Sequence, residues 1–160
     1  MVLDGNSIIN RAYYGVRPLT TRDGFFTHAI FGFLTMLGRL LDEEKPEATF
    51  RHLEYEGYKA TRHAMPEELA MQMPVLKDVL DAMNIPRYEL AGFEADDLIG
   101  TISRKCESAG WDCVVATGDK DSLQLVTEHT TVKLISTRMG QTTTKDMTPV
   151  SFFESYGFAP

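Results

Sequence analysis

The sequence has few of the features that mark secreted or membrane proteins. It contains only two cysteines, Cys106 and Cys113, which form neither a disulfide framework nor a CxxC metal motif. We therefore expect reduced, buried thiols in a cytoplasmic protein. The longest apolar stretch, HAIFGFLTMLGRLL, is too short and too interrupted to span a bilayer. Asp4 breaks the first apolar run, so no secretory signal segment is visible.

The chain also has no excess of positive charge. It carries 16 Lys and Arg against 23 Asp and Glu, a formal net charge of -7. A nucleic-acid partner usually requires a basic surface, so the balance argues weakly against one unless acids and bases cluster in different places. The length of 160 residues and the 43% hydrophobic content suit one globular domain with a core. No internal repeat, low-complexity run or linker divides residues 1–160.

Apolar patterning predicts strands that alternate with helices. Pro74 lies inside the second long helix and is expected to kink or split it. Strands alternating with helices indicate an α/β domain with a mostly parallel central sheet. The predicted strands are 1–3, 87–90, 112–117 and 131–137, a hairpin turn is expected at 138–143, and the predicted helices are 7–16, 27–44, 65–84, 95–109, 122–126 and 148–157.

Acidic residues follow three of the predicted strands. These residues are Asp4, then Glu94, Asp96 and Asp97 in FEADDLIG, then Asp119 and Asp121 in ATGDKD. Parallel strands present their carboxyl ends at one edge of a sheet, so the six carboxylates are expected to converge there. Carboxylates without His or Cys favour Mg²⁺ or Mn²⁺. Two such ions are the usual device for in-line phosphoryl displacement.

Each acidic group also has a purely structural interpretation. An Asp after a strand is often a helix N-cap, and acids in a first helical turn complement the helix dipole. DGN and GDKD can each form turns. The occurrence of acids at three strand ends, paired at two of them, favours the metal site.

Basic and aromatic residues interleave between Phe50 and Pro66. At helical spacing, Arg51, Tyr55, Tyr58, Lys59 and Arg62 gather toward one face. This pattern suits a nucleic-acid strand, with cations for phosphates and rings for bases. Lys59 and Arg62 can also offset charge on a reacting phosphate. The alternative is a solvated amphipathic helix, because Glu54 and Glu56 balance part of the charge.

The motifs together closely resemble the 5′-nuclease domain of bacterial DNA polymerase I, of the flap-endonuclease group. The matching segments are LDGNSIINRAYYGV, TTRDGFFTHAIFGFLTML, FRHLEYEGYKATR, MPEEL, YELAGFEADDLIGTI, VVATGDKDSLQLV and TPVSFFESYG. The resemblance implies a PIN-like (Rossmann-like) three-layer fold with a helical arch region around residues 50–84. It also implies a metal-dependent phosphodiesterase that acts at 5′ flaps, nicks and RNA primer ends of DNA, a polymerase domain in the parent chain, and a monomer.

Site residues follow from the same resemblance. Asp4, Glu94, Asp96, Asp97, Asp119 and Asp121 match the family's metal-site acids, which hold Mg²⁺ or Mn²⁺. Tyr58, Lys59 and Arg62 match the basic helix that grips the scissile phosphate, and Arg51 flanks it.

The chain departs from the family pattern at two places. Ala48 runs directly into Thr49, where the family has a central strand that ends in a metal-site Asp. Either this strand is deleted or its residues are left out of this numbering, and the second is favoured because loss of a core strand would unfold the domain. The chain also stops at YGFAP, before the family's helix–hairpin–helix DNA-binding element. Two further functions therefore compete with the nuclease: a module that binds DNA 5′ ends without cleaving them, and a phosphotransfer domain, which also places Asp residues at strand ends.

Overall fold

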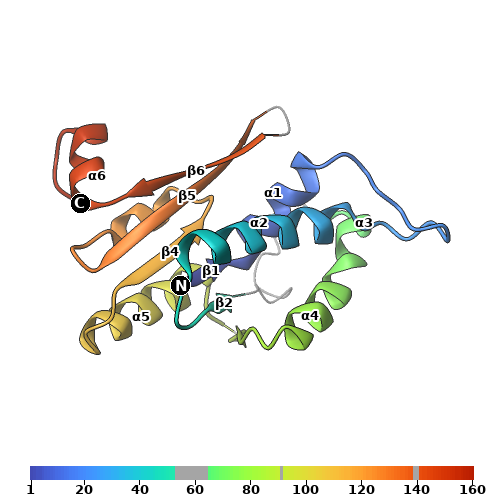
Figure 1. Ribbon diagram of the computed structural model, residues 1–160, viewed down its shortest axis with the longest axis horizontal. Helices are drawn as coiled ribbons and strands as arrows, with labels where there is room; N and C mark the ends of the chain where they lie inside the picture. The colour runs from blue at the N-terminus through green and yellow to red at the C-terminus, as the bar shows by residue number, and fades with distance from the viewer. Residues whose placement is uncertain (53–64, 91, 139–140) are drawn as a thin grey trace.

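A six-stranded sheet forms the centre of the protein, whose computed structural model describes residues 1–52, 65–90, 92–138 and 141–160. The strand order is β3-β2-β1-β4-β5-β6, and all neighbouring strands are parallel except β6, which runs antiparallel to β5 (Figure 1). The strands are β1 (Val2–Asp4), β2 (Phe50–His52), β3 (Arg87–Tyr88), β4 (Cys113–Thr117), β5 (Thr130–Arg138) and β6 (Gln141–Met147).

Helices cover both faces of the sheet. They are α1 (Gly5–Gly15), α2 (His28–Glu44), α3 (Glu67–Ala70), α4 (Gln72–Ala82), α5 (Ala95–Ser108), the 3-10 helix η1 (Asp121–Leu125) and α6 (Pro149–Tyr156). Leu3 and Ala116 belong to a core shared with α1, α2 and α4. Their neighbours Val2 and Val115 belong to a second core with α5, η1 and α6. Because successive strand residues face opposite sides, two cores and three layers result.

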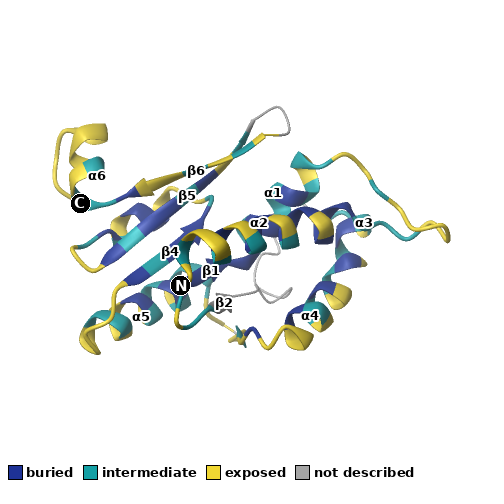
Figure 2. Ribbon diagram, viewed as in Figure 1, coloured by how far each residue is buried: buried dark blue, intermediate teal, exposed yellow. Residues whose placement is uncertain are grey.

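The buried positions follow these two cores. Strand β1 is buried along its whole length and β4 at all positions but one, whereas α4 and α6 are exposed on their outer sides (Figure 2). Helix α1 approaches α2 closely at Gly32, where an added Cβ would lie 2.9 Å from the Ala12 Cβ. A larger residue at position 32 would therefore push the two helices apart.

Most predicted elements are present. The helix predicted over residues 65–84 is interrupted at Met71 and continues as α3 and α4. Pro74 explains the break, because it has no N–H to donate to the carbonyl of Ala70 one turn earlier. The prediction of a mostly parallel α/β sheet is confirmed. The antiparallel strand β6, a polar run of threonines, was not predicted as a strand.

Strand β2 begins directly after the Ala48–Thr49 junction. Residues Phe50–His52 pair in parallel with β1 on one side and with β3 on the other, and His52 stands in register with Asp4. The sequence predicted a helical pattern from residue 50 onward, and this was wrong for residues 50–52. Three residues are enough for β2 because its neighbours are also short: β1 has three residues and β3 has two.

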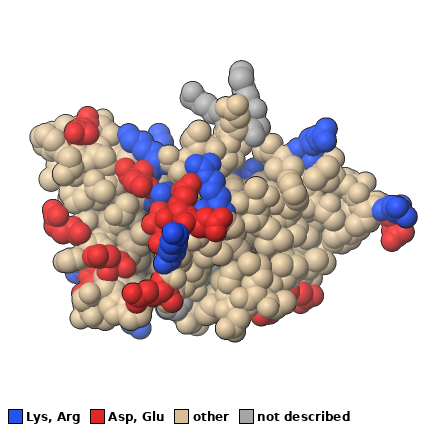
Figure 3. All heavy atoms as spheres, in the orientation of Figure 1, with Lys and Arg blue, Asp and Glu red and all other residues tan. Residues whose placement is uncertain are grey.

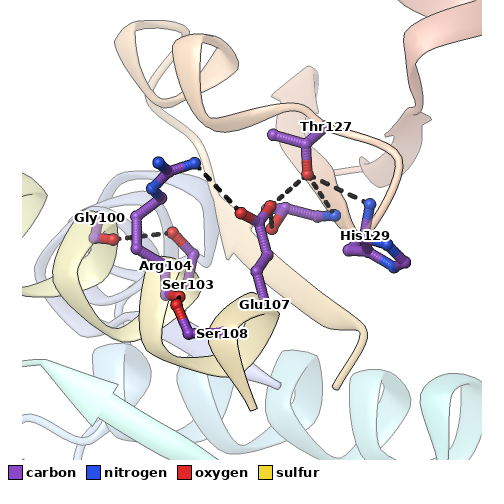
Figure 4. Close-up of polar contacts among 8 residues, drawn as sticks. Gly100, Ser103, Arg104, Glu107, Ser108, Thr127 and His129 are labelled. Carbon is purple, nitrogen blue, oxygen red and sulfur yellow. Dashed lines mark hydrogen bonds and ion pairs between the residues drawn. The ribbon is translucent and has the colours of Figure 1, made fainter. Parts of the chain in front are cut away.

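Helix α5 is tied to the loop before β5 by one carboxylate. Glu107 Oε1 accepts hydrogen bonds from the hydroxyls of Thr127 and Thr130, and its Oε2 lies 3.3 Å from Arg104 Nη1 (Figure 4). The two threonine hydroxyls lower the pKa of Glu107. This contact anchors the C-terminal end of α5, whose N-terminal end carries Asp96 and Asp97.

A buried lysine joins α2 to the β5–β6 hairpin. Lys133 is 5% exposed, and its Nζ lies 2.6 Å from Asp146, 2.9 Å from Glu44 and 3.7 Å from Glu43. Acidic and basic side chains gather on this face near the end of α2 (Figure 3). Burial lowers the pKa of Lys133, but hydrogen bonds to Asp146 and Glu44 outweigh it, so the pKa is raised.

Both cysteines are free thiols, as predicted. Burial raises the pKa of Cys113 to about 12, so this thiol stays protonated and unreactive at neutral pH. Cys106 is only partly buried. Within the part of the chain that the structure describes, every helix is too short or too polar to cross a lipid bilayer.

Gln72 offers a test of how α4 is attached to α2. It is fully buried, and its Oε1 accepts hydrogen bonds from the backbone N–H groups of Ala29 (3.0 Å) and Ile30 (3.3 Å) in the first turn of α2. Gln72→Leu should lower the free energy of unfolding by about 2 kcal/mol, because two buried donors lose their acceptor. Urea denaturation measures this, with the exposed Gln124→Leu as the control. Equal stability of the two variants would contradict the role of Gln72.

Lys133 predicts a dependence on alkaline pH. The pKa of Lys133 in the folded protein is raised above its ordinary value of 10.5. Charged Lys133 therefore stabilises the fold fully below pH 10.5, and this stabilisation is lost as pH rises through the folded pKa. Lys133→Met should therefore be less stable than the wild type at pH 8, by about 2 kcal/mol. The difference should shrink as pH rises above about 10.5. Thermal melts of both proteins at matched pH values test this, and a pH-independent difference would rule out the ion pairs as its source.

Candidate metal centre at the carboxyl edge of the sheet

Three segments meet at the edge of the sheet where β1 and β4 end. Asp4 is the last residue of β1, and Asp119 and Asp121 follow β4. Asp96 and Asp97 lie in the first turn of α5, which packs on β1 and β4. The pairing of β1 with β4 brings residues more than 110 positions apart into one place.

Asp4 is the most enclosed of these carboxylates, at 5% exposure. Its Oδ1 caps α1 by accepting a hydrogen bond from Ser7 N at 3.0 Å. Its Oδ2 accepts a hydrogen bond from Thr117 Oγ1 at 2.8 Å. The N-cap interpretation of Asp4 therefore holds, yet the same side chain faces the end of β4.

Glu94 and Asp97 form a reciprocal capping box at the start of α5. The Glu94 side chain accepts a hydrogen bond from the Asp97 backbone N–H, and Asp97 Oδ2 accepts one from Glu94 N at 3.0 Å. Two of the three acids in FEADD thus have a structural task that explains their presence. The third, Asp96, takes no part in this cap.

Asp119 and Asp121 shape the turn that follows β4. Asp119 Oδ1 accepts a hydrogen bond from Asp121 N at 3.0 Å, and Asp119 N donates to Thr117 Oγ1 at 3.0 Å. Both side chains lie at exposed positions. They are therefore open to solvent ligands while their backbone is held in place.

The negative charges of the neighbouring acids all act on the carboxyl of Asp96. Burial raises the pKa of this carboxyl, and the negative charges of Asp4, Asp119, Glu94 and Asp121 raise it further. The four other carboxylates are therefore near enough to Asp96 for their charges to act on it. An arrangement of this kind costs folding energy unless a cation offsets it.

The donor set suits a hard divalent cation, because it offers only carboxylate oxygens. Among the described residues, however, no three acidic, His or Cys side chains are close enough together to hold an ion as they stand. Hydrogen bonds direct Asp4, Asp97 and Asp119 toward backbone and hydroxyl partners. Cation binding would draw Asp96 and Asp119 closer together.

Two polar residues of the site were missed by sequence reasoning. Ser7 Oγ accepts a hydrogen bond from Gly118 N at 3.0 Å, and Thr117 Oγ1 joins Asp4 to Asp119. For Ser7 the sequence signal is its spacing from Asp4, the N-cap of α1, and from Arg11, which lie three and four residues away and so on the same side of the helix.

The structure describes only one of the five predicted nucleic-acid residues. Tyr55, Tyr58, Lys59 and Arg62 lie outside the described residues. Arg51 is in β2, paired with Leu3 of β1. The role of these five residues therefore stays a prediction.

Comparison with known proteins identifies the family. The family model of the 5′-3′ exonuclease N-terminal resolvase-like domain matches residues 1–157. The chain belongs to this family. It is thus a member of a nuclease family, as the motifs predicted. It is 40% identical to DNA polymerase I of Bacillus subtilis over 170 positions and 41% identical to DNA polymerase I of Mycobacterium leprae over 172.

These 5′-3′ exonuclease relatives are much longer than the chain. The alignments cover 100% of the chain but only 19% of each polymerase. The alignment with the Bacillus protein is also ten positions longer than the 160 residues of the chain, so that relative has at least ten residues that this chain lacks.

Solved structures of the same fold come from bacteriophage T5. The T5 D15 protein co-crystallised with metal ions superposes with a TM-score of 0.67 over 98% of the chain and 59% of its own length. A complex of the T5 D15 flap endonuclease with DNA and metal ions gives 0.65, over 98% and 60%. Sequence identity is 16% in both cases, so these likenesses confirm the PIN-like fold alone.

The repulsion at Asp96 predicts a gain in stability when its charge is removed. Because the folded pKa is raised above 3.8, the ionised form opposes folding, and stability falls as pH rises through the folded pKa. Asp96→Asn should raise Tm at pH 7 without divalent ions by about 2–4 °C, the shift that about 1 kcal/mol gives in a domain of this size.

The control for this prediction is Asp78→Asn, at an exposed position of α4, which should leave Tm unchanged. The advantage of Asp96→Asn should shrink as pH is lowered through the raised pKa of Asp96, because the wild-type carboxyl then becomes protonated. A lower Tm for Asp96→Asn at pH 7 would show that Asp96 stabilises the fold rather than opposing it.

Proposed function

We propose that the chain hydrolyses phosphodiesters near DNA 5′ ends, as a 5′-3′ exonuclease and flap endonuclease that uses two divalent cations, Mg²⁺ or Mn²⁺. The proposed cation ligands are Asp4, Glu94, Asp96, Asp97, Asp119 and Asp121. A bound cation would activate water and neutralise charge on the phosphate. The carboxylates hold that cation, and the basic residues hold the DNA.

The observation that carries the proposal is the repulsion focused on Asp96. Burial and four neighbouring acids raise the pKa of this one carboxyl. Three helix caps or turns would not need to place their charges within reach of each other. A cation site explains why they do so, because the ion offsets the repulsion that otherwise opposes folding.

DNA would approach this edge from two sides. Tyr55, Tyr58, Lys59 and Arg62, with Arg51 beside them, would contact the strand, and Tyr58, Lys59 and Arg62 would lie at the scissile phosphate. On the described surface, a shallow groove runs along α5 and η1 from Asp96 and Asp97 to Arg104 and Lys105. The groove leaves the acids accessible to a long ligand, which an enclosed small-molecule pocket would not.

The setting of the activity is also a proposal. The relatives that the chain matches are named DNA polymerase I, and we propose a polymerase domain in the same parent chain. Residues 1–160 would then form a 5′-nuclease domain that precedes a helix–hairpin–helix element, act as a monomer on primer ends and nicks, and reside with the nucleoid in the cytoplasm.

A second function is a module that binds DNA 5′ ends without cleaving them. Two observations favour it: the described acids do not close around an ion, and β2 ends at His52 beside Asp4 without a carboxylate of its own. A phosphotransfer domain is disfavoured because a small phosphate substrate has no need of the basic and aromatic residues.

Cleavage of a labelled 5′-flap DNA separates these functions. The nuclease predicts release of 5′ fragments with Mg²⁺ or Mn²⁺ and none with EDTA. DNA binding without product, from folded protein in Mn²⁺, would replace the nuclease by the binding module. Absence of both binding and cleavage would remove DNA as the substrate.

The substitution Asp119→Asn tests whether this carboxylate is needed for cleavage. The change removes one charge but keeps an oxygen that can accept the hydrogen bond from Asp121 N. It should reduce cleavage at least about 100-fold with the Tm unchanged or raised. Asp112→Asn, an exposed position paired with His129 at 3.1 Å, is the matched control and should cleave normally. Full activity of Asp119→Asn would exclude Asp119 as a ligand.

A further inference from the structure

One face of α1 holds the loop that leaves β4. Ser7 Oγ accepts a hydrogen bond from Gly118 N at 3.0 Å. One turn further along, the guanidinium of Arg11 donates through Nη2 to Gly118 O. Asp4, at the start of the same face, holds Thr117 Oγ1 at 2.8 Å. The segment Thr117–Gly118–Asp119 is therefore held at three points, by Asp4 at the end of β1 and by Ser7 and Arg11 of α1.

These contacts fix the peptide unit directly before Asp119. The carbonyl of that unit belongs to Gly118 and accepts from Arg11. Its N–H belongs to Asp119 and donates to Thr117 Oγ1 at 3.0 Å. With both polar groups held, the peptide plane cannot rotate, and the direction in which the Asp119 side chain leaves the backbone is set.

Arg11 reaches this position because residue 118 is glycine. An added Cβ at Gly118 would overlap the Arg11 guanidinium. Arg11 Nε is buried and has no hydrogen-bond partner among the described residues. The position of the guanidinium therefore depends on the hydrogen bond from Nη2 to Gly118 O. A buried donor without a partner is costly, which shows that the guanidinium is held in a specific place despite that cost.

We propose that Arg11 is a positioning residue for the metal centre, and that it acts through the Gly118 peptide to aim Asp119 toward Asp96. The proposal rests on the proposed function, because it concerns the same site. Residues that orient metal ligands commonly change metal affinity by about 10–100-fold when removed. Neither the family match nor the acidic motifs assign this role to Arg11.

The test is the affinity for Mn²⁺ alone, measured by electron paramagnetic resonance of the free ion, with Tm and DNA affinity measured on the same samples. Arg11→Met should weaken Mn²⁺ binding about 10-fold. Arg11→Lys keeps the positive charge but not the planar guanidinium. It should therefore bind Mn²⁺ more tightly than Arg11→Met but more weakly than the wild type. Arg39→Met is the control, because Arg39 donates to Thr142 O and does not reach Gly118.

Three results would overturn the proposal. One is unchanged Mn²⁺ affinity in Arg11→Met with a lower Tm, which would make Arg11 purely structural. Another is unchanged Mn²⁺ affinity with weaker DNA binding, which would make it a DNA contact. The third is an equal loss of Mn²⁺ affinity in Arg39→Met, which would show that the loss comes from removing any positive charge and not from the Arg11 contact.

A second variant covers the case in which Arg11→Met does not fold. Ser7→Ala removes only the acceptor for Gly118 N and should weaken Mn²⁺ binding about 3-fold, whereas normal affinity would count against the α1 contacts as a whole. If the wild type itself binds no Mn²⁺, the proposed function fails first, and that outcome differs from every result above.

Discussion

The parallel pairing of β1 with β4 places Asp4 against the loop that carries Asp119. Val2 pairs with Val115 and Leu3 with Ala116, so both strands end at the same edge, and Thr117 Oγ1 then bridges Asp4 Oδ2 and Asp119 N. The pair also divides the two cores, because adjacent residues of each strand face opposite layers. If this register slipped by one residue, the cores would exchange faces and the carboxylates would separate.

Much of this arrangement could be predicted from sequence, for a physical reason. Buried parallel strands are apolar runs, and acids directly after them must lie at the carboxyl edge. A local signal also predicted the break near Pro74. The short strand β2 was not predictable, because three residues show no period and its pairing with β1 and β3 is a long-range contact. Ser7 and Arg11 were missed because their partners belong to a loop more than 100 residues away.

The sheet is continuous on both sides of Asp4. Strand β1 has a parallel neighbour on each side, β4 and β2. Strand β2 is formed by Phe50–His52, at the start of the basic stretch. The chain thereby keeps a continuous sheet beside Asp4, and it places His52 at the edge in register with that carboxylate.

The central claim is that the acids at this edge bind divalent cations, and anomalous scattering from crystals grown with Mn²⁺ tests it most directly. We predict at least one strong anomalous peak within coordination distance, roughly 2.0–2.4 Å, of Asp96 and Asp119 carboxylate oxygens. The claim would be contradicted if these carboxylates were well ordered in crystals grown with millimolar Mn²⁺ and no anomalous peak lay beside them. The acids would then serve only as helix caps and turn residues.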